Sequence, residues 1–581
     1  MTRKIRYMIA VAALCSASVA CTNLDEELFS SVTTENYYNT ARDVKRMVFR
    51  PFEHAFWSIQ SLYTLNELTA DQLVTVQRDG WWDDGGSWRN LHYHTYDRTS
   101  EGLEELYAPW LAGFHGVGEC NFVVEELNRL DLAKFGFTDN QISNYKAQIR
   151  ALRAWFYLRL FDTYRYLPLV VSFYDQSLNT KEQVEPEVIF KFIEKELKES
   201  LEGIGEKSAL GTQSQLEGLW TKAGVASMLV RLYLNAEVYI GEDHFADCET
   251  YARNIVNGEY GPYKVADRWD AIFDWDNDTC DEMIFGFPSK GGYTYWHYSS
   301  YMFWDSVPHN YNLIIGDTKS KPGIHNCKYA ASPSYDLYGN LYTYSLGMPV
   351  QKFRKYPGDY RMTNYRNLGN SRREGMFVYG YLEYKDPQTG QMTKKTAPER
   401  AYTIYIRDAI GQFQDIDPEQ WPSDKASNMR NGDHNSGWHY VKYPLYADGE
   451  EGQLESDWAE IRLPEIIYSL AECLLRKGET TEAAELLNDV RRRNYPEEKW
   501  PEVLYAPEGT VTLDMDEMLD EWGREFFAEG RRRIDLIRFG KFSSGRWWDK
   551  TADADDHWQI FPLTNYVLNL DHSLKQVPGY N

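Results

Sequence analysis

Apolar residues recur at spacings of three and four positions through much of the first half of the chain. The pattern is present in Trp110 to Leu127, Ile142 to Leu160, Glu187 to Leu201 and Leu219 to Ala236. Such spacing places apolar side chains on one face of an α-helix, so we expect amphipathic helices that pack on one another. Pro168 predicts the end of the second helix, because a proline disfavours the α conformation at the preceding residue. The short connections predict antiparallel helix pairs in a solenoid-like scaffold.

Between about residues 262 and 455 the pattern changes to loops and short strands. We expect a strand at Met376 to Tyr384, a turn at Asp386 to Gly390 and a second strand at Tyr402 to Ile406. This part of the chain is therefore predicted to be a loop-rich insertion on the helical scaffold.

Helical spacing returns between Glu460 and Asn494. Small residues stand at Ala471 and at Ala483-Ala484, and Gly478 lies between them. Small residues let two antiparallel helices approach closely, and a glycine suits the turn that joins them. The segment therefore resembles a tetratricopeptide helix pair.

A densely charged run follows from Arg524 to Arg538. Glu529 and Arg533 are four positions apart, as are Arg531 and Asp535, so a helix would place each pair on one surface as an ion pair. The run alternates with apolar residues, which favours partial burial over a fully solvated charged face.

The N-terminus has the features of a secretory signal peptide. Basic residues precede an apolar run over residues 8–14, and small residues lead to Cys21. We expect a signal peptide at 1–20. Cys21 resembles the lipidated cysteine of bacterial lipoproteins, so residues 21–35 are expected to be a lipid anchor and tether. The alternative is a soluble exported protein in which Cys21 is incidental.

The composition restricts the classes of partner. The chain carries 62 basic and 87 acidic residues, for a net charge of −25, which excludes the concentrated basic face that nucleic-acid binding needs. Its seven cysteines are scattered without a CxxC pair, so neither a zinc site nor a disulfide scaffold is indicated. After loss of Cys15 and modification of Cys21, five cysteines remain, so at least one thiol should be unpaired.

Aromatic residues make up 15% of the chain, and two dense groups are candidates for ligand binding. In the first group, residues 79–90, glycines and aspartates predict a loop that holds indole rings near water. The faces of such rings suit the apolar faces of sugars, and neighbouring polar side chains can select hydroxyl groups. The candidates in this group are Trp81, Trp82, Asp83, Trp88 and Arg89. The alternative is that these rings form a small apolar cluster beneath a long loop.

The second aromatic group spans Tyr293 to Asp305. It is too dense and irregular for an ordinary core helix, so we expect some of its rings to be exposed or to cover others. The candidates for ligand contact are Tyr295, Trp296, Tyr298, Tyr301 and Trp304.

Two possible metal sites are weak, and we expect neither a metal nor a cofactor. Asp274 to Asp278 begins like a calcium-binding EF-hand loop, but Thr279 replaces the glycine and Phe285 replaces the bidentate glutamate, so a solvated turn is favoured. His92 and His94 would share one face of a strand and are interpreted as ordinary hydrogen-bonded histidines.

An enzyme is the main alternative to a binding protein. A glycoside hydrolase could use Asp83 or Asp84 with a distant carboxylate, but no nucleophile elbow, P-loop or zincin motif is present. The sequence therefore favours a binding protein without catalytic residues.

The charged run also resembles the signature of the SusD-like (RagB/SusD) family. The signature residues are Glu529-Gly530, Arg532, Asp535-Leu536 and Arg538-Phe539. The resemblance continues in other parts of the chain, through Arg462, Glu465, Ala471, Glu472, Asn488 and Arg491, Phe561 to Leu563, Lys575 to Tyr580, Arg150 to Val170, Asp276-Asn277, Glu282 to Phe285, and Asp359 to Arg361.

This resemblance implies a mainly α protein with four tetratricopeptide-like helix pairs and a loop-rich half that carries the ligand site. It implies an outer-membrane, cell-surface lipoprotein that binds a polysaccharide or oligosaccharide and covers a SusC-type TonB-dependent transporter as a hinged lid. Many relatives place an asparagine and a cysteine near the ligand, which adds Asn326 and Cys327 to the candidates. A peptide- or glycoprotein-binding relative remains an alternative.

The expected organisation is one SusD-like domain over residues 36–581. Its helical scaffold would comprise residues 36–261 and 456–581, and the ligand-binding insertion residues 262–455.

Overall fold

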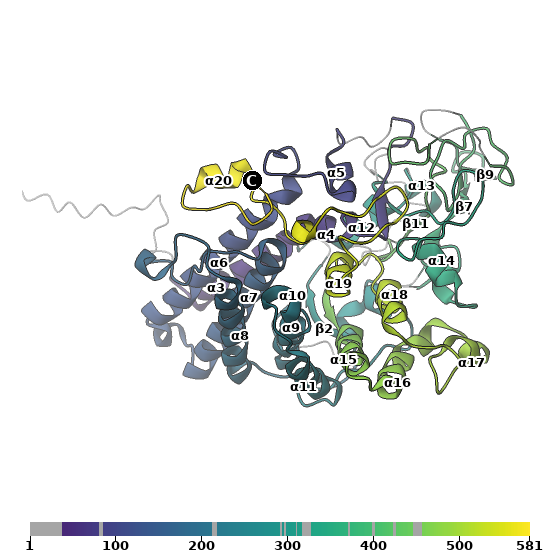
Figure 1. The fold of residues 1–581 in the computed structure, drawn as a ribbon. Helices are drawn as coiled ribbons and strands as arrows, with labels where there is room; N and C mark the ends of the chain where they lie inside the picture. The colour runs from purple at the N-terminus through teal and green to yellow at the C-terminus, as the bar shows by residue number, and fades with distance from the viewer. Residues whose placement is uncertain are drawn as a thin grey trace, which may run out of the picture.

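Helices occupy one side of the molecule, and loops with short strands occupy the other (Figure 1). The computed structural model describes residues 38–80, 85–211, 218–290, 293–294, 298–309, 311–315, 327–369, 372–397, 401–421, 426–445 and 456–580. The predicted signal peptide, lipid anchor and tether lie outside these ranges. The expected mainly α class, with a loop-rich region that carries short strands, is confirmed.

Consecutive helices pack on one another through the first half of the chain. The contacts run from α6 to α7, α7 to α8, α8 to α9, and α9 to α11, and then to α15 in the second half. The first-half helices are α3 (Ala41–Trp57), α4 (Ile59–Leu68), α5 (Ser87–Tyr93), α6 (Ala108–Arg129), α7 (Asp139–Tyr164), α8 (Pro186–Gly203), α9 (Lys222–Leu234), α10 (Ala236–Ile240) and α11 (Phe245–Val256).

The four helices expected from apolar spacing are present as α6, α7, α8 and α9. Helix α7 begins at a capping box, in which Thr138 and Gln141 satisfy each other's backbone N–H groups. It ends at Tyr164, before Pro168, as expected. Local capping and apolar spacing therefore account for these helices.

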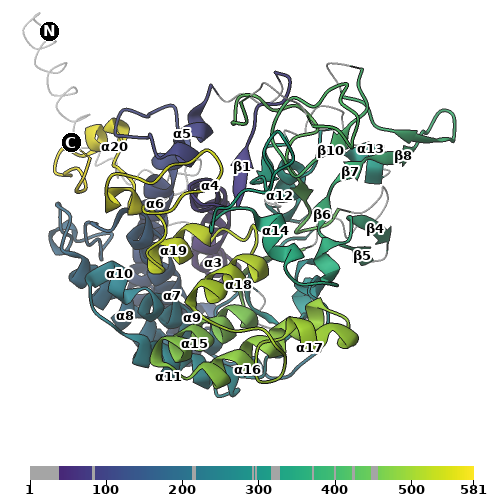
Figure 2. The same cartoon turned by 45° about the vertical axis from the view of Figure 1, so that its right-hand side comes forward.

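The second half returns to helices that pack against the first set (Figure 2). Helices α15 and α16 form the expected pair, and Gly478 ends α15 with a φ of +90°. The remaining helices are α12 (Tyr298–Ser306), α13 (Asn312–Ile315), α14 (Pro349–Arg354), α15 (Leu463–Lys477), α16 (Thr480–Arg491), α17 (Trp500–Val503), α18 (Met515–Glu525), α19 (Arg532–Arg538) and α20 (Asn565–Leu570).

The strands form two-stranded antiparallel pairs in the part of the chain that the structure describes. The pair β1–β3 aligns Leu73 with Ala331, and β2–β12 aligns Phe287 with Trp458. The strands are β1 (Leu73–Thr75), β2 (Met283–Phe287), β3 (Tyr329–Ala331), β4 (Arg366–Gly369), β5 (Arg372–Glu374), β6 (Phe377–Val378), β7 (Gly380–Tyr381), β8 (Glu383–Lys385), β9 (Met392–Lys394), β10 (Tyr405–Ile406), β11 (His439–Tyr440) and β12 (Trp458–Arg462).

The prediction of one continuous strand over residues 376–384 was wrong. The segment is divided into β6, β7 and β8, and Gly380 has a φ of +71°, a conformation that interrupts an extended strand. The expected turn at 386–390 is confirmed, because Asp386 accepts hydrogen bonds from the N–H groups of Gln388 and Thr389, each at 2.8 Å. The expected strand at 402–406 is reduced to β10.

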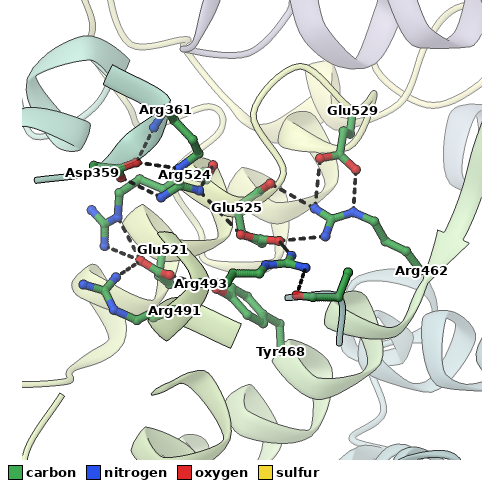
Figure 3. Close-up of polar contacts among 12 residues, drawn as sticks. Asp359, Arg361, Arg462, Tyr468, Arg491, Arg493, Glu521, Arg524, Glu525 and Glu529 are labelled. Carbon is green, nitrogen blue, oxygen red and sulfur yellow. Dashed lines mark hydrogen bonds and ion pairs between the residues drawn. The ribbon is translucent and has the colours of Figure 1, made fainter. Parts of the chain in front are cut away.

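Buried ion pairs join the helices of the second half (Figure 3). Arg462 donates to Glu525 at 2.7 Å and to Glu529 at 2.8 Å, and Arg493 donates to Glu525 at 2.6 Å. Burial alone would raise the pKa of Glu525, but the surrounding guanidinium groups of Arg493, Arg462 and Arg361 outweigh it and hold that pKa well below its usual value. The signature residues therefore form part of the core.

One of the two expected ion pairs in the charged run is present. Arg531 and Asp535 lie 3.0 Å apart, as expected. The predicted Glu529–Arg533 pair was wrong, because these side chains have partners elsewhere in the chain. Glu529 accepts from Arg462, whereas Arg533 pairs with Asp162 on α7 at 3.1 Å. Glu529 precedes the start of α19, so the two residues are not on one helix surface.

The turn that precedes α19 contacts α4. The Gly530 N–H donates to Glu67 Oε1 at 2.6 Å, and the Gly530 carbonyl accepts from Asn66 Nδ2 at 2.9 Å. Gly530 has a φ of +76°, and an added Cβ would lie 3.1 Å from the Tyr63 ring, so glycine fits this position best. The glycine of the family signature therefore has a packing role.

The five cysteines in the described ranges form no disulfide with one another: Cys120, Cys248, Cys280, Cys327 and Cys473. The expectation of at least one unpaired thiol is confirmed. Among the described residues, no helix combines the length and apolar composition needed to cross a membrane.

Candidate functional site

Three segments that the sequence identified as candidates for ligand binding meet in the folded chain. Trp88 lies on α5, Asp305 lies on α12, and Lys328 immediately precedes β3. The Lys328 Nζ atom is 3.1 Å from Asp305 Oδ2 and 5.1 Å from the centre of a Trp88 ring. Residues separated by more than two hundred positions are therefore adjacent. Helices α5 and α12 lie near the boundary between the helices and the loop-rich half (Figure 1).

Trp88 is a support for this surface and is not open to solvent. Its side chain is 8% exposed, its Nε1–H donates to Glu105 Oε1 at 2.9 Å, and its ring stacks on Tyr329 with centroids 5.6 Å apart. The prediction that this ring stands in water was wrong, and the alternative of an apolar cluster holds for it. Gly85 and Gly86, with φ of +73° and +92°, turn the chain into α5 and direct Trp88 inward.

Arg89 is half-buried beside the same turn. A Cβ added at Gly86 would lie 2.6 Å from Arg89 Nη2, so the guanidinium lies against the glycine backbone. Gly86 therefore makes room for Arg89 at the edge of the candidate site.

The second aromatic group is partly helical, which the sequence did not predict. Helix α12 buries Met302 and Phe303, whereas Trp304 is half-buried and packs edge-on against Phe303 at 4.9 Å. Tyr293, before the helix, is 85% exposed. The group thus contains both exposed and covering rings, as expected, but its C-terminal part follows an ordinary helical arrangement.

Several candidates lie where the structure gives no account of them. Tyr298 and Tyr301 belong to α12, but their side chains are not described. The candidates outside the described residues are Trp81, Trp82, Asp83, Tyr295, Trp296 and Asn326. Their contact with a ligand stays a prediction.

Cys327 is fully buried beside Arg78. Its carbonyl oxygen accepts a hydrogen bond from Arg78 Nη1 at 3.2 Å, and its φ is +36°. The thiol is therefore covered by protein, and any role of Cys327 near a ligand would come from its backbone or its neighbours.

Sequence reasoning missed a polar cluster that anchors the start of the 79–90 segment. Tyr402 donates to Asp79 Oδ2 at 2.6 Å and accepts from the His434 N–H at 3.1 Å. Burial raises the pKa of the nearby Asp433 to about 6 and lowers the pKa of His434 to about 4. These partners are more than three hundred positions from Asp79, and no local spacing indicated them.

Sequence reasoning also missed a hollow of about 740 Å³ beside α13. The residues that line it include Tyr311, Tyr365, Tyr381, Asn364 and Arg366. Tyr381 is exposed, whereas Tyr311 and Tyr365 are buried. The hollow combines phenol rings with amide and guanidinium groups in the loop-rich half.

The two weak metal sites are hydrogen-bonded structure. His92 Nε2 lies 2.7 Å from Asp549, and His94 Nδ1 lies 2.7 Å from Asp553, so both are hydrogen-bonded histidines as expected. The predicted strand was wrong, because His92 is on α5 and His94 caps that helix. The expected turn is present at residues 275–276, where Asp276 is exposed, but the residues on either side of this turn are not solvated. Asp274 and Asn277 are buried, and Asn277 Nδ2 donates to two carbonyl groups.

Comparison with known proteins gives one consistent result. Residues 305–580 match the model of the SusD family. The chain is 22% identical over 558 residues to the starch-binding protein SusD of Bacteroides thetaiotaomicron, covering 90% of this chain and 85% of that protein.

Solved structures show the same fold. A SusD superfamily protein from Bacteroides fragilis superposes with a TM-score of 0.63 at 19% identity, covering 94% of this chain and all of that one. A laminarin-binding SusD-like protein superposes with a TM-score of 0.62 at 17% identity, also covering 94% of this chain and all of that one.

Proposed function

We infer that the chain belongs to the SusD family, and from this premise we propose that it captures a polysaccharide or oligosaccharide at the surface formed by α5, α12 and the segment that enters β3. One observation carries the proposal: the three candidate segments meet where Lys328 contacts both Asp305 and the Trp88 ring. The named relatives bind starch in one case and laminarin in another, which supports a glycan as the ligand class.

The buried parts of this surface give it a fixed shape. Trp88, Tyr329 and Glu105 form a stacked and hydrogen-bonded base, and the Lys328–Asp305 pair joins α12 to it. A rigid base can hold neighbouring aromatic side chains in a fixed arrangement without a large entropic cost on binding. We propose that Trp81 and Trp82, which precede α5, and the tyrosines and tryptophans near the start of α12 supply the rings that stack on sugars.

The expected affinity is weak. If each stacked ring removes about 50 Å² of apolar surface from water, it contributes roughly 1.3 kcal/mol at about 25 cal/mol per Å². Three rings would contribute about 4 kcal/mol, which corresponds to a dissociation constant near 1 mM. Several contacts along one polymer raise the apparent affinity, and weak single contacts allow release.

We further propose that the protein is a cell-surface lipoprotein of the outer membrane that delivers its ligand to a SusC-type TonB-dependent transporter. The sequence supports a lipid on Cys21, and the family supports the transporter as partner. In this proposal residues 21–35 are the tether, and residues 36–581 act as one domain that covers the transporter.

A gel-retention assay with the purified full chain tests glycan capture. Gels that contain starch, laminarin or other polysaccharides should retard the protein, and Trp81→Ala or Trp82→Ala should abolish retardation with an unchanged circular dichroism spectrum. Trp57→Ala is the control, because Trp57 is 42% exposed and lies on α3, which is not one of the three segments. Unchanged retention in both test variants would remove these tryptophans from the site, and loss with Tyr381→Ala would move the site to the hollow beside α13.

The same protein and polysaccharides also distinguish capture from the two alternatives, a glycoside hydrolase and a peptide-binding relative. Release of shorter sugars during incubation would show a glycoside hydrolase, whereas binding without products supports capture. Retention only by a peptide or glycoprotein matrix would identify the peptide-binding relative.

A further inference from the structure

Two histidines and a glutamate come together between α3 and α6, outside the proposed glycan site. His54 is on α3, and His115 and Glu119 are on α6. Each side chain offers one ligand atom, and the three atoms lie within 4.8 Å of one another. The imidazole rings of His54 and His115 stack with centroids 4.5 Å apart. The cluster thus bridges two packed helices.

The hydrogen bond of His54 leaves its other ring nitrogen available as a ligand. His54 Nε2 lies 2.9 Å from the carbonyl oxygen of Ala112, and a carbonyl can only accept, so Nε2 carries the proton. The lone pair is then on Nδ1. Metal-binding histidines usually have this arrangement, in which the second ring N–H donates to a carbonyl or carboxylate.

His115 and Glu119 are one helical turn apart. His115 Nε2 is 3.2 Å from Glu119 Oε1, and the His115 side chain is 59% exposed, so its ring has space to reorient. The second carboxylate oxygen of Glu119, Oε2, is buried and has no hydrogen-bond partner among the described residues. A buried carboxylate oxygen without a donor is unfavourable, and a cation at this position would satisfy it.

We propose that His54, His115 and Glu119 bind a divalent transition-metal ion of the Zn²⁺ type between α3 and α6. Two imidazoles and one carboxylate are a common ligand set for Zn²⁺, and a water molecule can take the fourth position. Ca²⁺ and Mg²⁺ are poor candidates, because they prefer ligand sets made of oxygen. The bound ion joins α3 to α6.

Arg50 competes with a bound cation for the Glu119 carboxylate. Its Nη2 atom lies 3.4 Å from Glu119 Oε1, and its Nη1 atom lies 2.6 Å from Glu53. Both Arg50 and Glu53 have exposed side chains, so Arg50 can remain with Glu53 when Glu119 binds a cation. Removal of Arg50 should therefore strengthen metal binding.

Titration of the chelator-treated full chain with Zn²⁺ against a colorimetric indicator tests the site. We expect one ion per chain, a weakening of at least roughly tenfold in His115→Ala and in Glu119→Gln, and stronger binding in Arg50→Ala. His115→Ala is the decisive variant, because its exposed ring can be removed without opening the core, whereas His54 is buried. His572→Ala is the matched control, since His572 is an exposed histidine outside the cluster.

A thermal-melting series provides the second measurement. Zn²⁺ should raise the Tm of the wild type and of His572→Ala, but not that of His115→Ala, whereas Ca²⁺ should have no effect. Absence of saturable Zn²⁺ binding, or equal binding in wild type, His115→Ala and Glu119→Gln, would overturn the proposal. The result is independent of glycan retention, because no residue of the cluster belongs to the proposed glycan surface.

Discussion

Asp71 accepts two hydrogen bonds from Arg532, at 2.7 Å from Nε and 3.1 Å from Nη2. The two residues are 461 positions apart, and both side chains are buried. Arg532 belongs to the family signature, and Asp71 follows α4. Together with the Arg533–Asp162 pair and the Glu67–Gly530 contact, this ion pair joins the signature to the first helices.

Loss of this pair should destabilise the fold. Asp71→Asn leaves the Arg532 guanidinium buried without its counterion, and breaking a buried ion pair in this way costs about 3–5 kcal/mol. The free energy of unfolding from urea titration measures the effect. Glu374→Gln is the control, since the Arg366–Glu374 pair is exposed and should contribute less than about 1 kcal/mol. Equal urea midpoints for Asp71→Asn and the wild type would contradict the assignment.

Glu67 should make stability fall as pH rises from the acidic range to its raised pKa in the folded chain. Burial raises its pKa in the folded chain from 4.5 to about 8, although the Gly530 N–H partly opposes this. The folded state therefore binds the proton more tightly, so the stabilisation is present below pH 4.5 and is lost as pH approaches and passes 8. Glu67→Gln should remove this loss and be more stable than wild type at pH 9, by about 1 kcal/mol or more.

Urea midpoints measured between pH 5 and pH 9 test this prediction. The wild-type midpoint should decrease more steeply with pH than that of Glu67→Gln. Parallel pH profiles for the two proteins would show that Glu67 is ionised in the folded chain at neutral pH.

Trp88 should affect stability more than recognition. Trp88→Ala leaves a cavity beside Tyr329 and removes the hydrogen bond that Glu105 accepts from the indole. The free energy of unfolding should therefore decrease by about 3–5 kcal/mol. Trp57→Ala, at an exposed ring, should change it by less than about 1 kcal/mol. Thermal melting of the two variants and the wild type measures the difference. A Trp88→Ala protein that keeps the wild-type Tm but is not retained by glycan would show that this indole contacts the ligand.

Cys21→Ala should release the protein from membranes. Without the thiol no lipid can be attached, and the remaining chain has no described helix that could hold it in a bilayer. Cell fractionation with labelled fatty acid measures attachment, and Cys280→Ala, at a half-buried thiol within the fold, should keep both label and location. Label on Cys21→Ala would disprove lipidation at that residue.

Local sequence patterns predicted the helical scaffold well and the candidate surface in part. Apolar spacing placed α6 to α9 within a few residues, because each helix buries one continuous face. The 79–90 segment was predicted as a loop, whereas α5 begins at Ser87. Two glycines with positive φ allow a sharp turn into this helix, and the spacing of apolar residues does not indicate such a turn. Glu529 was paired with the wrong arginine for a related reason: its partner, Arg462, is distant in sequence.

The proposed metal site shows the same limit of local patterns. His115 and Glu119 are four positions apart on one helix, which is a recognisable local signal, but His54 lies sixty-one positions before His115 and becomes a neighbour only when α3 packs on α6. His92 and His94 are also close in sequence, but the carboxylates of Asp549 and Asp553 each contact one of their ring nitrogens.

The long-range ion pairs also determine at what length a newly made chain can complete its folding. Until residues 530–533 are available, Asp71, Asp162 and Glu67 must enter the interior without the groups that satisfy them, which costs several kcal/mol. A partly synthesised chain is therefore disfavoured from packing its first helices into the final arrangement before these residues are present. A product truncated before α19 should fail to reach a protease-resistant state, even though it contains every described helix from α3 to α18.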